Sequence, residues 1–228
     1  MGGKLISFFI GFFSIINIAA YANDNVNFNS LFYLGLDAVY SNMQFRKDFG
    51  RNIFNKSTVG GNIAFGYSLT NTIGFEVGHE AAKKKKTEVT LYENNYAAGW
   101  LVTNYTGPVA FKSELRQRHS YFGVIFNSNI NEDCFASILF GASLSKIKAQ
   151  YSMLQSRSTI AGIDYYSKTK LIPTARLGLI FKLADHVGIR IFSTWRDTNK
   201  FKIKSKEYKA YTIKLNNYFN WGIGVLFI

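Results

Sequence analysis

Apolar and polar residues alternate with a period of two along most of this chain, which is the spacing of a β-strand with two different faces. The pattern is clearest in the last segment, 211–228, where every second residue is apolar and small or polar residues lie between. The five apolar positions are Phe219, Trp221, Ile223, Val225 and Phe227. The same alternation recurs in 31–41, 58–69, 73–80, 118–127, 135–145, 173–183 and 187–195. We therefore predict eight strands and an all-β fold.

The connections between these predicted strands alternate in length. Three are tight turns, near 70–72, 128–133 and 184–186, and four are longer and polar, near 45–57, 81–117, 146–170 and 196–210. Long loops at one end and short turns at the other are typical of an antiparallel up-and-down barrel in an outer membrane. The side chains of so small a barrel fill its interior, so a pore for solutes is not expected.

The less apolar face of several strands combines glycine and serine with charges of both signs. These charges are Asp37, Glu76, Glu80, Arg176 and Arg190. A soluble barrel such as a lipocalin would bury the apolar face and leave the charges on a surface rich in glycine. Inside a narrow transmembrane barrel the charges can pair, while the small residues make room for them. We therefore predict an eight-stranded transmembrane β-barrel that contains an ion network and is closed, since lipid cannot pair with an open sheet edge.

The N-terminal segment has a different design. Lys4 precedes an apolar run over 5–16, and Ala20, Tyr21 and Ala22 form the small-x-small pattern that a signal peptidase accepts. This predicts a secretory signal peptide cut after Ala22, with an uncleaved membrane anchor as the alternative. The expected organisation is a signal peptide, 1–22, followed by one barrel domain, 23–228.

Across residues 31–228 the chain resembles the eight-stranded barrel family of opacity-type, OmpA-like and OmpX-like bacterial outer-membrane proteins. The resemblance rests on the signal peptide, the loop rhythm, the stretch GGNIAFGYSLTNTIGFEVGHE (60–80) and the terminal strand. That strand is similar to the C-terminal signature of outer-membrane proteins, although Ile228 follows the aromatic Phe227. The resemblance implies a monomer in a Gram-negative outer membrane, in contact with lipopolysaccharide and other lipids and with the barrel-assembly machinery.

Charge supplies the main functional signal, because the chain carries a formal net charge of +13. Such an excess favours an anionic partner, and export argues against nucleic acid. One basic run is Lys83, Lys84, Lys85 and Lys86. In a second segment Lys200, Lys202, Lys204 and Lys206 alternate with other residues. On an extended hairpin these four would share one face, about 6.6 to 7 Å apart. Candidate ligands are lipopolysaccharide phosphates and host-cell glycans or matrix proteins. A solvated rim without a partner explains the lysines equally well.

Catalysis is the alternative class, in the form of a lipid A-modifying hydrolase, which needs a nucleophile beside a base. Of the three histidines, His186 falls in a short turn and His79 on the apolar face. Ser120 directly follows His119 and so points to the opposite face of the strand. We expect His119 to form a structural pair with Glu80. The sequence therefore predicts a structural or adhesive surface protein that is not an enzyme and needs no cofactor or metal.

Overall fold

The fold is a single twelve-stranded antiparallel sheet, seen in a computed structural model that describes residues 32–43, 57–91, 109–155, 158–166, 169–198, 202–205, 212–215 and 218–228. The strands are β1 (Phe32–Asn42), β2 (Ser57–Ser68), β3 (Ile73–Ala82), β4 (Lys85–Leu91), β5 (Val109–Asn131), β6 (Cys134–Gln155), β7 (Ser158–Tyr166), β8 (Lys170–Ala184), β9 (Val187–Arg196), β10 (Lys202–Ser205), β11 (Thr212–Lys214) and β12 (Tyr218–Phe227). The expected signal peptide, 1–22, lies outside the described residues, as does most of the expected loop 45–57.

Eight of these strands close into a barrel. Their order is β6-β8-β9-β12-β1-β2-β3-β5, and β5 pairs with β6 to complete the cylinder. The last strand, β12, lies between β9 and the first strand, β1, so the two ends of the described chain meet in the sheet. Closure leaves no free sheet edge in the barrel wall, as the alternating pattern predicted.

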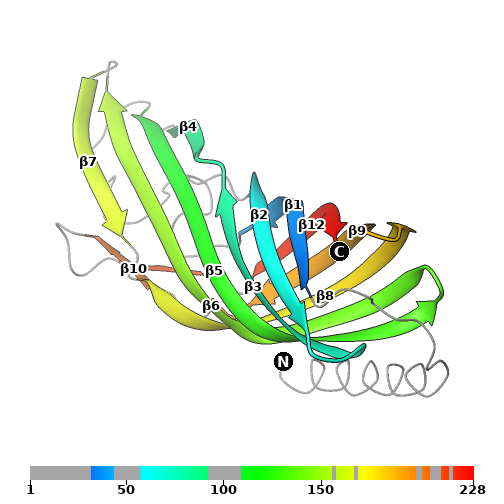
Figure 1. The fold of residues 1–228 in the computed structure, drawn as a ribbon. Helices are drawn as coiled ribbons and strands as arrows, with labels where there is room; N and C mark the ends of the chain where they lie inside the picture. Colours follow the sequence, from blue (N-terminus) through cyan, green and yellow to red (C-terminus); the bar gives the residue numbers. More distant parts are fainter. Residues whose placement is uncertain are drawn as a thin grey trace.

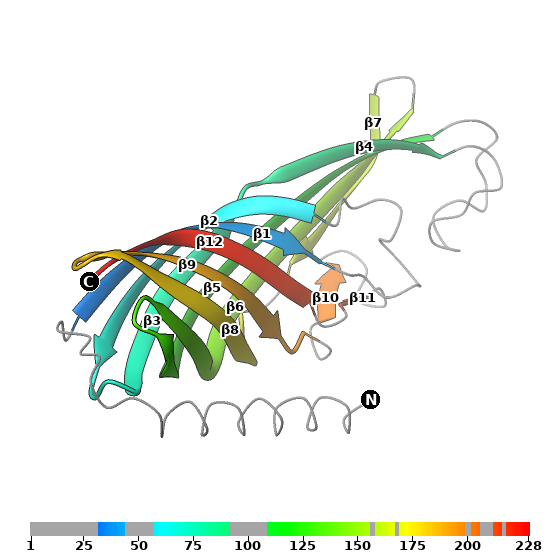
Figure 2. The same cartoon turned by 90° about the vertical axis from the view of Figure 1, so that its right-hand side faces the viewer.

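Beyond one end of the barrel the sheet continues as a projection. Figures 1 and 2 show the barrel strands β5 and β6 extending well past the ends of the other barrel strands, on the side away from the C-terminus. The strands β4 and β7 lie beside these extensions. There β4 pairs with β5, β7 with β6, β10 with β7 and β11 with β10. The opposite end carries the tight turns at 69–72, 132–133 and 185–186.

The loop predictions for 81–117, 146–170 and 196–210 were therefore wrong in part, because these ranges contain β4, β7, β10 and long extensions of β5 and β6. The predicted strand 211–228 is also two strands, β11 and β12. The reason is physical. Above the bilayer the outer face of a strand meets water, so no apolar stripe is needed and the period-two signal of a membrane strand disappears.

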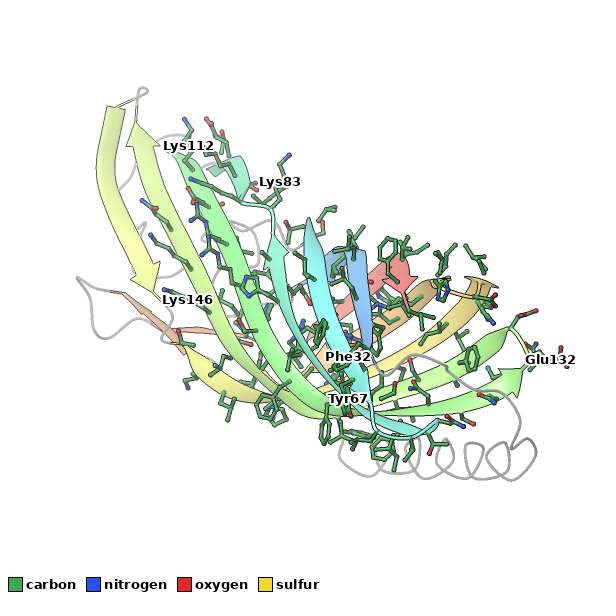
Figure 3. All side chains as sticks on the ribbon, in the orientation of Figure 1. Phe32, Tyr67, Lys83, Lys112, Glu132 and Lys146 are labelled. Carbon is green, nitrogen blue, oxygen red and sulfur yellow. The ribbon has the colours of Figure 1, made fainter. Side chains whose placement is uncertain are left out.

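Along the barrel wall the apolar face points outward. In β1 exposed and buried residues alternate strictly over eleven positions, and the exposed set includes Phe32, Leu34 and Leu36. Figure 3 shows Phe32 and Tyr67 together on the outer surface. Trp221 and Ile63 are each 59% exposed. So extensive an apolar surface is rare on soluble proteins, and strands of ten or eleven residues suffice to cross a bilayer. The fold is a transmembrane β-barrel.

The interior is filled by its own side chains. At the end with the tight turns Tyr33, Phe135, Ile180 and Leu226 form a buried apolar cluster, with Ile228 packed against it. Polar and charged side chains occupy the levels above this cluster. A cavity of about 20 Å³ remains beside them, which is room for about one water molecule. None of the described segments forms a helix long and apolar enough to cross a membrane.

A charge placed on the middle of the outer wall tests this orientation. Val77 lies midway along β3 and is 51% exposed, so Val77→Arg should lower the free energy of unfolding by about 2–4 kcal/mol in lipid vesicles. Leu183→Arg, next to the turn at 185–186, should lower it by no more than about 1 kcal/mol. Urea titration of the two variants in vesicles measures the difference, and equal effects would contradict a lipid-facing wall.

Candidate functional site

The centre of the barrel interior is the carboxylate of Glu76, which is fully buried. On one side its Oε1 contacts Arg176 and accepts a hydrogen bond from the Tyr121 hydroxyl at 2.7 Å. On the other side its Oε2 lies 3.0 Å from Arg190 Nη1 and accepts from the Tyr33 hydroxyl at 2.7 Å. These four partners come from β8, β5, β9 and β1, so one carboxylate on β3 joins strands around the whole cylinder.

Arg190 links Glu76 to a second carboxylate, Asp37. Its Nε lies 2.6 Å from Asp37 Oδ1 and its Nη2 lies 2.5 Å from Oδ2, which is the bidentate arrangement of strong arginine–carboxylate pairs. The side-chain amide of Asn62 donates to Asp37 Oδ2 at 2.6 Å and also lies 3.2 Å from the Tyr121 hydroxyl. All these groups form one hydrogen-bonded unit.

Aromatic rings cover the guanidinium of Arg176. Its Cζ lies 4.6 Å from the Tyr121 ring centre and 4.5 Å from the Phe192 ring centre. The Nε of Arg176 donates to Thr194 Oγ1 at 3.2 Å. Cation–π contact of this kind adds to the ion pair where water is excluded. The arrangement therefore holds Arg176 in place from several sides.

A second polar layer lies around Glu80. Its Oε2 is 2.7 Å from Arg196 Nη2, and its Oε1 accepts from the side-chain amide of Asn220. Ser143 and Thr174 form a hydroxyl pair at 2.5 Å, and Ser143 Oγ also accepts from Arg196 Nε at 3.4 Å. Arg196 is fully buried, so this ion pair is sealed from solvent like the first.

The charges of the described interior balance. The buried carboxylates are those of Asp37, Glu76 and Glu80, and the buried guanidiniums are those of Arg176, Arg190 and Arg196. Burying a charge without a partner costs several kcal/mol, whereas a paired group avoids most of that penalty. Since the interior is neutral, the net charge of +13 must come from residues outside it.

Glycine supplies the space for these large side chains. A Cβ at Gly66 would collide with the ring of Tyr33, and a Cβ at Gly78 with the ring of Tyr121. A Cβ at Gly35 would likewise press against the Arg190 guanidinium. The pairing of glycine with charge on one strand face therefore has a steric cause. The network needs room that only missing side chains provide.

The predicted network residues other than His119 meet in the two layers, and His119 lies buried beside Glu80 as expected. His119 lies directly opposite Glu80 in register, and its Nδ1 is 2.8 Å from Ser145 Oγ. Glu80 binds Arg196 and Asn220, as described above.

Sequence reasoning missed several members of these layers, namely Tyr33, Asn62, Tyr121, Arg196 and Asn220. Each has the strand parity of a predicted interior residue, so parity was the signal that could have found them. Arg196 in particular falls six residues after Arg190 on β9, just beyond the predicted strand end at 195.

The structure also corrects the reasoning about a serine beside a histidine. Ser120 does point away from His119, but His79 and His119 each contact a serine on the neighbouring strand. Inside the barrel the pair is His119 with Ser145, and each side chain is at most 1% exposed. On the outer wall His79 Nδ1 lies 2.9 Å from Ser120 Oγ, and both side chains are exposed.

The predicted basic residues are described only in part. Lys83, Lys84, Lys85 and Lys86 are exposed where β3 leaves the barrel and β4 begins, and Figure 3 shows Lys83 there with Lys112 above it. Lys84 Nζ lies 2.6 Å from a carboxylate oxygen of Glu114. Lys202 and Lys204 lie on β10, whereas Lys200 and Lys206 fall outside the described residues.

The terminal strand presents its apolar stripe to the outside. Phe219, Trp221, Ile223 and Phe227 are exposed on β12, and Val225 is half-buried. Within the described residues, no group of three or more His, Cys, Asp or Glu side chains is arranged to hold a metal ion.

Known proteins resemble the chain in shape and little in sequence. No model of a protein family matches it, and no curated protein matches it. Among solved structures, neisserial surface protein A is 16% identical, covering 87% of this chain and 97% of that one, with a TM-score of 0.46. The attachment invasion locus protein Ail of Yersinia pestis, in complex with the heparin analogue sucrose octasulfate, is 15% identical over 87% and 99%, with a TM-score of 0.47.

A protease is also among the similar structures. The outer membrane protease OmpT from Escherichia coli is 11% identical, covering 88% of this chain and 99% of that one, with a TM-score of 0.42. The assignment of this chain as a closed eight-stranded barrel rests on its own strand pairings and outward apolar face, which are independent of these likenesses.

Removing the central charge tests the interior network. Glu76→Gln keeps the shape of the side chain but leaves Arg176 and Arg190 short of a buried anion, which should destabilise the barrel by about 3–5 kcal/mol. The temperature at which the folded band disappears in a gel-shift assay should fall. Glu132→Gln, at the exposed turn between β5 and β6, is the control and should leave that temperature unchanged. An unchanged temperature for the Glu76→Gln variant would refute a stabilising network.

Proposed function

We propose that this chain is a monomeric surface protein of a bacterial outer membrane, structural or adhesive in role, whose basic extracellular strands bind anionic ligands. The ligands that fit are lipopolysaccharide phosphates and sulfated or otherwise acidic glycans of a host cell. The proposal joins two features of the chain, an outer wall suited to lipid and a large positive charge that the neutral interior does not contain.

The orientation in the membrane follows from the connections. Short turns and both ends of the described chain lie at one end, and the projection lies at the other (Figure 1). Outer-membrane barrels place their short turns in the periplasm and their long connections outside the cell. On this basis the projection, with β4 at its edge, faces the cell exterior.

The observation that carries the proposed function is the group of lysines at the base of the projection. Lys83, Lys85 and Lys86 are exposed there, beside the Lys84–Glu114 ion pair. Several ammonium groups on consecutive residues create a local positive potential that attracts polyanions and that salt screens. Lys202 and Lys204 lie on β10, which pairs with the edge strand β11 on the other side of the sheet.

Assembly of the barrel would use the terminal strand. The exposed apolar stripe on β12, which includes Phe219, Trp221 and Ile223, is the segment that we propose the barrel-assembly machinery recognises before the strand closes against β1.

An enzyme that modifies lipid A is the alternative, and one observation favours it. The His79–Ser120 pair joins a base to a hydroxyl on the lipid-facing wall, where an acyl chain could reach it. A serine nucleophile also needs a third group to orient the base. No carboxylate in the described part of the chain is bonded to His79. The other pair, His119–Ser145, is buried out of reach of a substrate. We therefore favour the binding function.

Heparin binding tests the proposed function. Lys85→Gln combined with Lys86→Gln should weaken binding of heparin by roughly tenfold, since each surface charge contributes up to about 1 kcal/mol. The effect should shrink as salt rises from low to physiological ionic strength. A second variant, with Lys200, Lys202, Lys204 and Lys206 all replaced by Gln, tests the other basic segment. Surface plasmon resonance with the refolded protein in detergent gives the affinities.

The matched control for the lysine pair is Lys182→Glu, which changes the net charge by the same two units at the opposite end of the barrel. Its surface ion pair with Asp185 contributes little to stability. This control should bind heparin like the unaltered protein. Unchanged affinity in both lysine variants would rule out the adhesive function for these segments.

Lipid A from cells tests the enzyme alternative. If the protein only binds, mass spectra of lipid A should show the same acyl chains in cells that express it, that lack it, or that express Ser120→Ala. A missing acyl chain that reappears with Ser120→Ala would establish the enzyme and overturn the proposal.

A further inference from the structure

Four cations gather on the outer face of β5 and β6, just above the lipid-facing wall. Arg118 lies directly opposite Lys146 in register, and Arg116 lies opposite Lys148 in the next row. Arg118 and Lys146 are exposed, and Arg116 and Lys148 are half-buried. We call these four residues the wall cluster. They belong neither to the lysine run of 83–86 nor to the segment 200–206.

The wall cluster places like charges side by side. Directly opposite residues of an antiparallel pair have Cβ atoms about 4.5–5.5 Å apart, and like charges at that spacing repel. Glu114, one row above Arg116, is already bound by Lys84 at 2.6 Å. Among the described residues, no carboxylate forms an ion pair with Arg116, Arg118 or Lys146. A ligand anion would relieve this repulsion.

The apolar wall begins immediately below the cluster. Ser120 and Leu144 form the row beneath Arg118 and Lys146, and Phe122 and Ala142 form the row after that. Leu144 is 52% exposed and Phe122 is 57% exposed. Each row lies about 6.6–7 Å further along the strands. Figure 3 shows Lys146 projecting from β6 on this outer side. The cations and the lipid-facing side chains are therefore close enough together for one ligand to contact both.

We propose that the wall cluster binds the phosphate group of a phosphorylated lipid of the outer leaflet, with the acyl chains of that lipid lying on Phe122 and Leu144. Guanidinium groups suit phosphate because they donate two parallel hydrogen bonds to its oxygens. A lipid fits better than a soluble anion, because the cluster adjoins the apolar wall instead of the tip of the projection. The hydroxyl of Ser120 and the ring of His79 add polar groups at the same boundary.

This inference rests on the outer-membrane location proposed above and is independent of the ligands of Lys83–Lys86. The probes are lipid A with both of its phosphates and lipid A from which the phosphates have been removed. Native mass spectrometry of the purified barrel in detergent counts the lipid molecules retained over a titration. The unaltered protein should retain phosphorylated lipid A and release the dephosphorylated form.

Arg118→Gln combined with Lys146→Gln should weaken retention of phosphorylated lipid A. Each cation near an anionic lipid contributes about fivefold in affinity, so the pair should account for roughly thirtyfold. Lys182→Glu changes the net charge by the same two units at the opposite end of the barrel and should leave retention unchanged. An unaltered heat-modifiable gel shift confirms that each variant is folded.

Three results would overturn the inference. They are full retention by the folded Arg118→Gln, Lys146→Gln protein, equal retention of dephosphorylated lipid A, and displacement of the lipid by millimolar inorganic phosphate. The last result would mean that the cluster binds any phosphate and that the apolar wall plays no part. The heparin affinity of the Lys85→Gln, Lys86→Gln double variant is measured separately. Failure of the proposed adhesive function is therefore distinguishable from failure of lipid binding by the wall cluster.

Discussion

Lipid offers no hydrogen bonds to a polypeptide backbone, and the rest of this structure depends on that constraint. Every N–H and C=O group within the bilayer must pair with another strand, so the sheet has to close. Closure here comes from β5 against β6 and from β12 against β1, which joins the two ends of the described chain. With the sheet closed, the two faces of each strand meet two different solvents. The outer face meets lipid hydrocarbon, and the inner face meets the other side chains that fill the barrel.

The division between these two solvents explains the distribution of charge. Within the barrel every described carboxylate is matched by a guanidinium, in one layer around Glu76 and another around Glu80. The interior can hold these groups because glycines such as Gly66 and Gly78 leave the space that Tyr33 and Tyr121 fill. The positive excess of the chain therefore lies outside the described interior, for example at the exposed Lys85 and Lys86 of β4 and at Arg118 and Lys146 on the outer face of β5 and β6.

Within the bilayer, strand positions could be predicted from residue type alone. The segments 31–41, 73–80 and 187–195 agree with β1, β3 and β9 to within two residues at each end. Outside the bilayer prediction failed. β5 begins at Val109 and β6 runs to Gln155, although 109–117 and 146–155 were expected to be loops. There the outer face of the two strands carries Arg116, Arg118, Lys146 and Lys148 in place of an apolar stripe, so the pattern that marks a membrane strand is missing.

By itself, the sequence determined which residues face inward, because parity along a strand is a local property. Asp37, Glu76, Arg176 and Arg190 could all be assigned to one face in that way. Only the tertiary structure decided which of them meet, since Glu76 and Arg176 are 100 residues apart and their strands are not neighbours in the sheet. The contacts of His79 with Ser120 and the opposition of Arg118 and Lys146 were decided in the same way. Cross-strand pairing depends on the register, and the register is set by the closure of the whole cylinder.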